Sequence, residues 1–290
     1  MSRSHAIILV LALAAACERD GWGPDALSHG TDPAARTLAR GRRTYATYCA
    51  GCHGDAGDGA GPAARFFKVK PRDLRKGRIK FASVAAGMTP RDEDLDRVIT
   101  RGLPGSAMPA FALLPEGDRR AVIAYVRTLS DAWKKPPAAA VAIPSDPWRK
   151  KPADAIALGE RLYHGKAQCS GCHPAYVARD ALAAIVTGAG LPFEGFRPGM
   201  YDAVAKDSEW GAPITPPDFL LHRLRAGVTR DDLVRTIAAG VGGTAMPSWG
   251  NALDAKELWA LAYYVESLAR DRGFPEATAR RAALLAQESR

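Results

Sequence analysis

Four of the five cysteines stand in two motifs of the same form, CAGCH at 49–53 and CSGCH at 169–173. In each motif two residues separate the cysteines, and a histidine follows the second cysteine directly. Three kinds of chemistry use such a pattern: a redox dithiol, half of a zinc site, and covalent attachment of haem. In the third, each thiol forms a thioether with a haem vinyl group and the histidine binds the iron. The rest of the sequence has to distinguish between them.

The chain contains an internal repeat with an offset of 138 residues. DLDRVITRG at 94–102 matches DLVRTIAAG at 232–240, and GSAMP at 105–109 matches GTAMP at 243–247. A Gly-x-x-x-Tyr sequence precedes each cysteine motif, with Gly41 and Tyr45 in the first half and Gly159 and Tyr163 in the second. The same parts in the same order indicate two copies of one domain.

The repeated parts have the periodicity of helices. Leu258, Leu261, Val265 and Leu268 recur at intervals of three and four residues and would form one apolar stripe along a helix. No convincing run of alternating strand residues is present, so the predicted fold class is all-α.

The predicted organisation has two helical domains joined by a linker. The segments are a signal peptide (1–16), an N-terminal tether (17–35), a first domain (36–133), a Pro-rich linker (134–153), a second domain (154–272) and a C-terminal tail (273–290). The linker is rich in proline and charge, so we expect it to be partly extended and to let the domains adjust. The tail is expected to form one more short helix on the surface.

The N-terminal segment MSRSHAIILVLALAAAC indicates export. Arg3 is followed by an apolar run of 11 residues, which is too short to span a bilayer but has the length of a signal-peptide core. Cleavage after Ala16 would leave Cys17 as the first residue. The stretch resembles a bacterial lipobox, with Ala14 in the usual leucine position, so we predict lipidation of Cys17 over a plain signal peptide. The mature protein is then expected to be periplasmic and anchored to a membrane, inner or outer.

Export, helical character and duplication together decide between the three chemistries. A thioredoxin-like dithiol is expected in a strand–helix context, which is absent here. In a zinc site, the two cysteine pairs would have to come together across 116 intervening residues, far more than in common zinc modules. Two CxxCH motifs at corresponding positions predict two covalently bound haems c. Cys49 and Cys52 would attach one haem and Cys169 and Cys172 the other, with His53 and His173 as iron ligands.

A second axial ligand is needed on the opposite face of each iron. The candidates are Met88, Met108, Met200, Met246, His29, His164 and His222. The repeat matches only Met108 and Met246, and each lies between a glycine-bearing loop and a proline. An ordinary core role is the alternative, but the matched context favours axial ligation. His222 is the rival to Met246, since 73 residues separate His173 from Met246 against 55 in the first half; an insertion at about 175–215 also explains this difference.

The chain resembles bacterial di-haem cytochromes c, which have two cytochrome c domains in tandem, over about residues 36–271. The resemblance rests on CxxCH with a downstream Met-Pro, and it implies one haem on Cys49, Cys52, His53 and Met108 and another on Cys169, Cys172, His173 and Met246. GDGAGP at 57–62 resembles the loop whose proline carbonyl accepts the N–H of the proximal histidine, which implies a bond from His53 to Pro62. The second half has Pro174-Ala175-Tyr176 there instead.

Segment 71–111 resembles domains attached to respiratory complexes and molybdenum oxidoreductases, which implies redox protein partners of that kind. The net charge of +9 would fall to about +4 after loss of Arg3 and addition of four haem propionates. No nucleic-acid motif is present, and the mildly basic surface favours acidic protein partners.

Three function classes were weighed. With His and Met on both irons, no coordination site is left for a substrate, so an electron carrier is predicted rather than an enzyme, and no catalytic residue is assigned. The alternative is a di-haem enzyme of the peroxidase or thiosulfate dehydrogenase type, which needs an iron that can open. A sensor would need an output domain, and the sequence has no segment of that kind.

Overall fold

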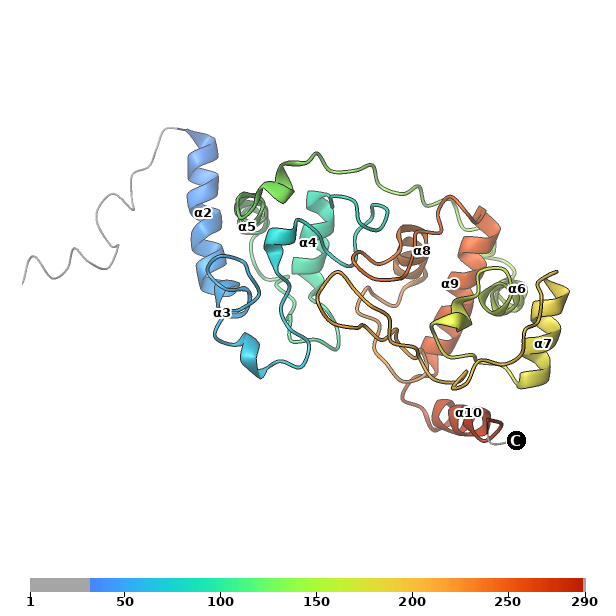
Figure 1. Ribbon diagram of the computed structural model, residues 1–290. Helices are drawn as coiled ribbons and strands as arrows, with labels where there is room; N and C mark the ends of the chain where they lie inside the picture. The colour runs from blue at the N-terminus through green and yellow to red at the C-terminus, as the bar shows by residue number, and fades with distance from the viewer. Residues whose placement is uncertain (1–31, 289–290) are drawn as a thin grey trace, which may run out of the picture.

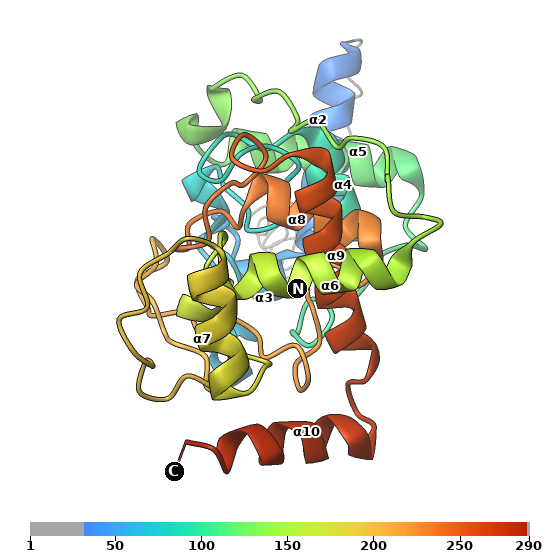
Figure 2. The same ribbon diagram turned by 90° about the vertical axis from the view of Figure 1, so that its right-hand side faces the viewer.

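The computed structural model describes residues 32–288, and all regular elements in this range are helical (Figures 1 and 2). The predicted all-α class is therefore confirmed. Cys17, His29 and the predicted signal peptide lie outside the described residues. None of the helices within 32–288 has both the length and the apolar character needed to cross a bilayer.

Each half is built around three main helices in the same order. The first half contains α2 (Pro33–Tyr48), α3 (Ala50–His53), α4 (Asp92–Arg101) and α5 (Glu116–Thr128), with short 3-10 helices η3 (Ala64–Phe66), η4 (Leu74–Lys76) and η5 (Asp131–Lys134). The second half contains α6 (Pro152–His164), η6 (Cys169–Gly171), α7 (Arg179–Gly188), α8 (Arg230–Ala239), α9 (Ala255–Arg270) and α10 (Pro275–Leu285). By order and packing, α2, α4 and α5 correspond to α6, α8 and α9.

The glycine of each Gly-x-x-x-Tyr sequence is the point where two helices cross. Helix α2 packs on α5, and α6 packs on α9. A Cβ atom at Gly41 would lie 2.0 Å from the carbonyl oxygen of Ala121, and one at Gly159 would lie 2.1 Å from that of Ala260. Because real Cβ atoms do not approach this closely, only glycine permits these crossings.

The first turn of α4 and the first turn of α8 each contain a buried carboxylate in the equivalent position. Asp94 is fully buried and accepts hydrogen bonds from the backbone N–H of Ser83 (2.7 Å) and from Arg97 (2.6 Å). Asp232 is likewise buried and bonded to Arg235 at 2.6 Å. Both carboxylates are paired, as buried charges generally are, and they fix the chain that enters each helix.

The predicted insertion of the second half forms a small core of its own. Met200 and Tyr201 are buried there together with Leu182 of α7 and Leu284 of α10. The predicted helix in the C-terminal tail is α10, which lies below α9 in Figure 2 and contributes Leu284 to this cluster. Met200 therefore serves as a core residue.

The linker is hydrogen-bonded to both domains, contrary to the expectation that it lets them adjust. On the first domain, the Val141 N–H donates to the Ser83 carbonyl at 2.7 Å. On the second, Trp259 Nε1 donates to the Pro144 carbonyl at 2.8 Å and the Tyr263 hydroxyl to Asp146 at 2.9 Å. Its prolines and buried aromatic partners hold it extended along the domains, which fixes their separation.

Direct bonds also join the two domains beside α4 and α8, which lie on either side of the boundary in Figure 1. The Gly242 N–H donates to the Lys80 carbonyl at 2.9 Å, and the Ala86 N–H donates to the Ala239 carbonyl at 2.8 Å. Arg101 at the end of α4 pairs with Asp232 at 2.8 Å. The two halves thus form one packed unit.

The helix crossing in the second domain yields a stability prediction. Gly159→Ala should lower the free energy of unfolding by roughly 1–3 kcal/mol, because the new methyl group would overlap the Ala260 carbonyl. Gly188→Ala in α7 is the matched control, since nothing lies within 4 Å of a Cβ atom there. Thermal unfolding of both variants measures the difference, and equal stability would contradict the proposed role of the glycine.

Candidate functional site

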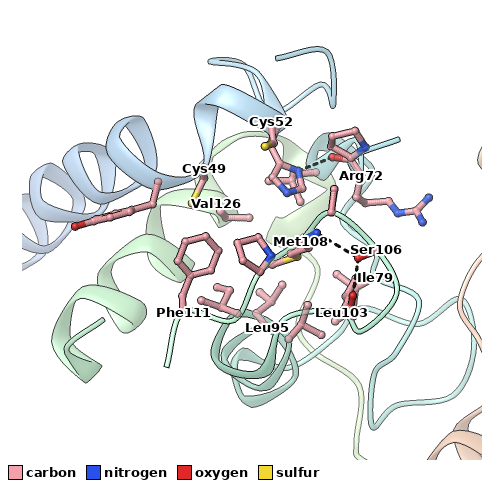
Figure 3. Close-up of a pocket in the computed structure, with 18 of the residues that line it drawn as sticks. Cys49, Cys52, Arg72, Ile79, Leu95, Leu103, Ser106, Met108, Phe111 and Val126 are labelled. Atoms are coloured by element: carbon pink, nitrogen blue, oxygen red, sulfur yellow. Dashed lines mark hydrogen bonds between the residues drawn. The ribbon is translucent and has the colours of Figure 1, made fainter. Parts of the chain in front are cut away.

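In the first domain, the CxxCH motif and the Met-Pro loop line one apolar cavity. Cys49, Cys52 and His53 line it together with Met108, and most of the other lining residues are aliphatic or aromatic. Figure 3 shows the two cysteines on the helical wall and Met108 on the opposing loop, above Leu95 of α4. The structure thus brings all four predicted site residues of this half together.

The ring of His53 is oriented by a backbone carbonyl, but not by the predicted one. Nδ1 lies 3.0 Å from the carbonyl oxygen of Arg72, so Nδ1–H donates and Nε2 keeps its lone pair. The predicted bond to Pro62 is wrong. The loop at 57–62 instead packs beneath the motif through its backbone, as Gly59 N–H donates to the His53 carbonyl at 2.8 Å. Burial lowers the pKa of His53, which favours the neutral imidazole that binds metals.

The second domain orients its histidine in the same way. His173 Nδ1 donates to the carbonyl of Pro217 at 3.0 Å. Segments 71–81 and 216–226 are therefore equivalent, with an offset of 145 that the sequence analysis missed. The ends of these segments are also held alike. Arg97 donates to the Phe81 carbonyl in the first domain, and Arg235 donates to the Ala226 carbonyl in the second. The signal was present in the sequence, as PRDLRKGRIKF and PPDFLLHRLRA share Pro, Asp and Arg at matching positions.

The tyrosine of each Gly-x-x-x-Tyr sequence fixes the residue that follows the histidine. The Tyr45 hydroxyl donates to the Gly54 carbonyl at 2.7 Å, and the Tyr163 hydroxyl donates to the Pro174 carbonyl at 3.0 Å. Both tyrosines are nearly inaccessible to solvent. The tyrosine therefore ties the motif to the helix that precedes it.

The two Met-Pro loops have the same hydrogen bonds. Leu103 N–H donates to the Met108 carbonyl at 3.1 Å, and the Ser106 hydroxyl accepts from the Met108 N–H at 3.2 Å. In the second domain, the Val241 N–H donates to the Met246 carbonyl at 3.2 Å and Thr244 replaces Ser106. Gly102 and Gly240 start the loops with φ of 63° and 75°, which favours glycine. The loops present both methionines with the same backbone.

The rival ligands have other roles in the described part of the chain. Met88 is 53% exposed, and Met200 belongs to the core beneath α7. His164 is buried, with Nδ1 donating to the Glu160 carbonyl and Nε2 accepting from the Tyr176 N–H. The Nδ1 atom of His222 accepts the Asp218 N–H at 2.9 Å. His222 therefore already has a hydrogen-bond partner on Nδ1, and the assignment of Met246 rather than His222 as the second ligand stays a prediction.

The first cysteine of each motif lacks the lowered pKa of a reactive thiol. Burial raises the pKa of Cys49 to about 11 and that of Cys169 to about 12. Redox-active cysteines have lowered pKa values, so that a thiolate is present at neutral pH. Between residues 32 and 288, no three His, Cys, Asp or Glu side chains are grouped as metal ligands. The donor set is a thiol pair and an imidazole facing a thioether, which fits a covalently attached haem.

This fold and these sites define a cytochrome c with two tandem domains, and the comparisons with known proteins agree. Residues 36–126 and 154–265 each match the family described as cytochrome c oxidase, cbb3-type, subunit III, and the chain belongs to this family. Covalent binding of haem c follows from that membership. The predicted membership of the bacterial cytochromes c with two tandem domains is thereby confirmed.

Two known proteins show the extent of the similarity. The cbb3-type cytochrome c oxidase subunit CcoP of Azospirillum sp. (strain B510) is 27% identical over 238 residues, covering 80% of this chain. The chain spans only 62% of the length of that relative. A chain of the Kuenenia stuttgartiensis reducing HAO-like protein complex superposes with a TM-score of 0.65 at 29% identity, covering 79% of this chain and 95% of that one.

Proposed function

We propose that the protein is a periplasmic electron carrier with two haems c that relays electrons between partners of a respiratory chain. The arrangement of the first cavity is the main support, because His53 and Met108 line one apolar space and Figure 3 shows Cys49 and Cys52 across it from Met108. A haem bound between them would have both axial positions filled. Such an iron exchanges electrons but has no vacant site for a substrate.

The chain's own residues would attach the haems, bind their irons, orient the imidazoles, exclude water and raise the reduction potential. Cys49 and Cys52 would hold the first haem as thioethers, with His53 and Met108 as its axial ligands. Cys169, Cys172, His173 and Met246 would do the same for the second. The Arg72 and Pro217 carbonyls would fix the two imidazole rings. The apolar walls would exclude water, and the soft methionine ligand raises the reduction potential. The haem itself supplies the one-electron change.

The proposed partners are membrane-associated redox proteins. The support is the similarity to a subunit of a cbb3-type cytochrome c oxidase, and a structural neighbour that is also part of a protein complex. A molybdenum oxidoreductase is the other partner class that segment 71–111 suggests. The net charge of +9, which falls to about +4 after loss of Arg3 and addition of four propionates, favours an acidic docking surface on either partner, with an exchange rate that falls as ionic strength rises.

One observation favours a second candidate function, a di-haem redox enzyme. The structural neighbour is described as part of a reducing HAO-like protein complex, and this similarity leaves an enzymatic role open. An enzyme of the peroxidase or thiosulfate dehydrogenase type would need one iron to lose its methionine. The matched Met108 and Met246 loops argue against such a difference between the two sites.

The axial ligands can be tested by spectroscopy. The oxidised protein should contain two covalently bound haems by a haemochrome assay after acid-acetone extraction, and should show the weak far-red band of iron–methionine bonding. Met108→Ala or Met246→Ala should each remove about half of that band and lower the potential of one haem. His222→Ala is the control. A spectrum changed by His222→Ala but not by Met246→Ala would refute the assignment in the second domain.

The proposed function itself is tested by turnover. Each iron would have both axial positions occupied by protein ligands. Fully reduced protein should therefore exchange electrons quickly with a small redox mediator and show negligible steady-state activity with peroxide or thiosulfate. Sustained turnover of either substrate that is abolished or changed in Met108→Ala or Met246→Ala would establish the enzyme instead of the carrier.

Attachment to a membrane through lipid at Cys17 is proposed from the lipobox-like sequence alone. A Cys17→Ser variant should be recovered in the soluble periplasmic fraction, because the acyl chains would have no acceptor. Recovery of this variant in the membrane at the wild-type level would show that something other than lipid holds the protein.

A further inference from the structure

Basic side chains line part of the first cavity, and none of the described residues that line it is acidic. Four basic side chains are among its lining residues, Lys70, Arg72, Lys80 and Arg225, and no Asp or Glu of the described chain is. The nearby carboxylates have other partners, since Glu209 pairs with Arg78 and Asp73 with Arg75. Lys70 is also bonded, as its Nζ donates to the Ala64 carbonyl at 3.0 Å. Arg72, Lys80 and Arg225 remain, and we call them the cation cluster.

The cation cluster combines residues of both domains. Arg72 and Lys80 belong to the segment that orients His53, whereas Arg225 comes from the equivalent segment of the second domain. Trp210, also from the second domain, lies over the Arg72 guanidinium at 3.7 Å from the ring centroid. The Gly242 N–H bond to the Lys80 carbonyl holds the same region in place. The first cavity is therefore completed by the second domain.

Arg72 and Arg225 lie close enough to Lys80 to disfavour its charge. Burial lowers the pKa of Lys80 to about 8, and repulsion by Arg72 and Arg225 contributes. Neither Lys80 nor Arg225 forms a salt bridge with a residue between 32 and 288. Partly buried cations are costly unless an anion compensates them, so this end of the cavity requires one.

A haem in this cavity would bring two carboxylates to the required place. Its propionates extend from the edge of the macrocycle opposite the edge that carries the thioether bonds. Figure 3 shows Cys49 and the Arg72 side chain at opposite ends of the cavity. We infer that Arg72, Lys80 and Arg225 bind the propionates of the first haem, so that a second-domain arginine is part of the first haem site. This inference rests on the proposed haem at that site.

Arg225 is the residue that tests the inference, because it lies in the other domain. Arg225→Gln would leave propionate charge uncompensated, which stabilises the ferric over the ferrous state. Redox potentiometry of the intact two-haem protein should show a fall in the potential of the first haem and no change in the second. The first-haem component is identified beforehand as the one that falls in Met108→Ala. Lys80→Gln should act in the same direction.

Two controls separate this effect from general loss of charge or structure. Arg223→Gln removes an exposed arginine two positions away, which does not line the cavity, and should leave both potentials in place. Arg225→Lys keeps the charge and should restore most of the wild-type potential. Unchanged potential in Arg225→Gln would overturn the inference. A fall confined to the second haem would also overturn it and assign Arg225 to its own domain.

A free anion from solution is the other source of negative charge. Inorganic phosphate, titrated into wild-type protein at constant ionic strength, should not change the potential of the first haem if the propionates already occupy the cation cluster. A change that Arg225→Gln abolishes would overturn the inference in favour of a solution anion. Haem content is measured first: wild-type protein without covalent haem refutes the proposed function and the inference together. If the wild-type protein contains two haems and Arg225→Gln leaves the potential of the first haem unchanged, the inference alone is refuted.

Discussion

The close crossing of two helices in each domain is the constraint on which the rest of the structure depends. In the first domain Gly41 lets α2 lie directly against the backbone of α5, and in the second Gly159 does the same for α6 and α9. The CxxCH motif starts at the end of α2 in the first domain and shortly after α6 in the second. The glycine therefore sets the distance of the motif from α5 in the first domain and from α9 in the second. A larger residue would separate the helices and move the thiols and the imidazole with them.

Much of the site was predictable because its signals are local. The cysteine motifs, the Gly-x-x-x-Tyr sequences and the Met-Pro loops each occupy a few consecutive residues, and the repeat doubles every signal. The carbonyl that orients His53 was not predictable in this way. Arg72 is 19 residues from His53 and Pro217 is 44 residues from His173, and any carbonyl can accept a hydrogen bond. Resemblance pointed to Pro62, whose loop packs beneath the motif through its backbone instead.

The linker shows a second limit of sequence reasoning. Proline and charge in 134–153 indicate an extended segment, and residues 136–148 contain no helix. Composition does not show whether an extended segment is docked, because docking depends on distant partners such as Trp259 and Tyr263. Here those partners lie on α9, and the linker joins the domains rigidly rather than loosely.

The domain interface explains why two copies of one domain need not behave alike. Lys80 and Arg225 are equivalent by the repeat, yet both line the first cavity. The bond from the Gly242 N–H to the Lys80 carbonyl has no counterpart, since Pro104 stands at the position equivalent to Gly242 and has no N–H. Arg101 pairs with Asp232, whereas the residue equivalent to Arg101 is Ala239. These substitutions break the symmetry at the contact surface while the helices and loops around each CxxCH motif keep it. The first cavity thus has electrostatic surroundings that its own domain alone does not supply, and such surroundings tune the potential of a redox group bound there.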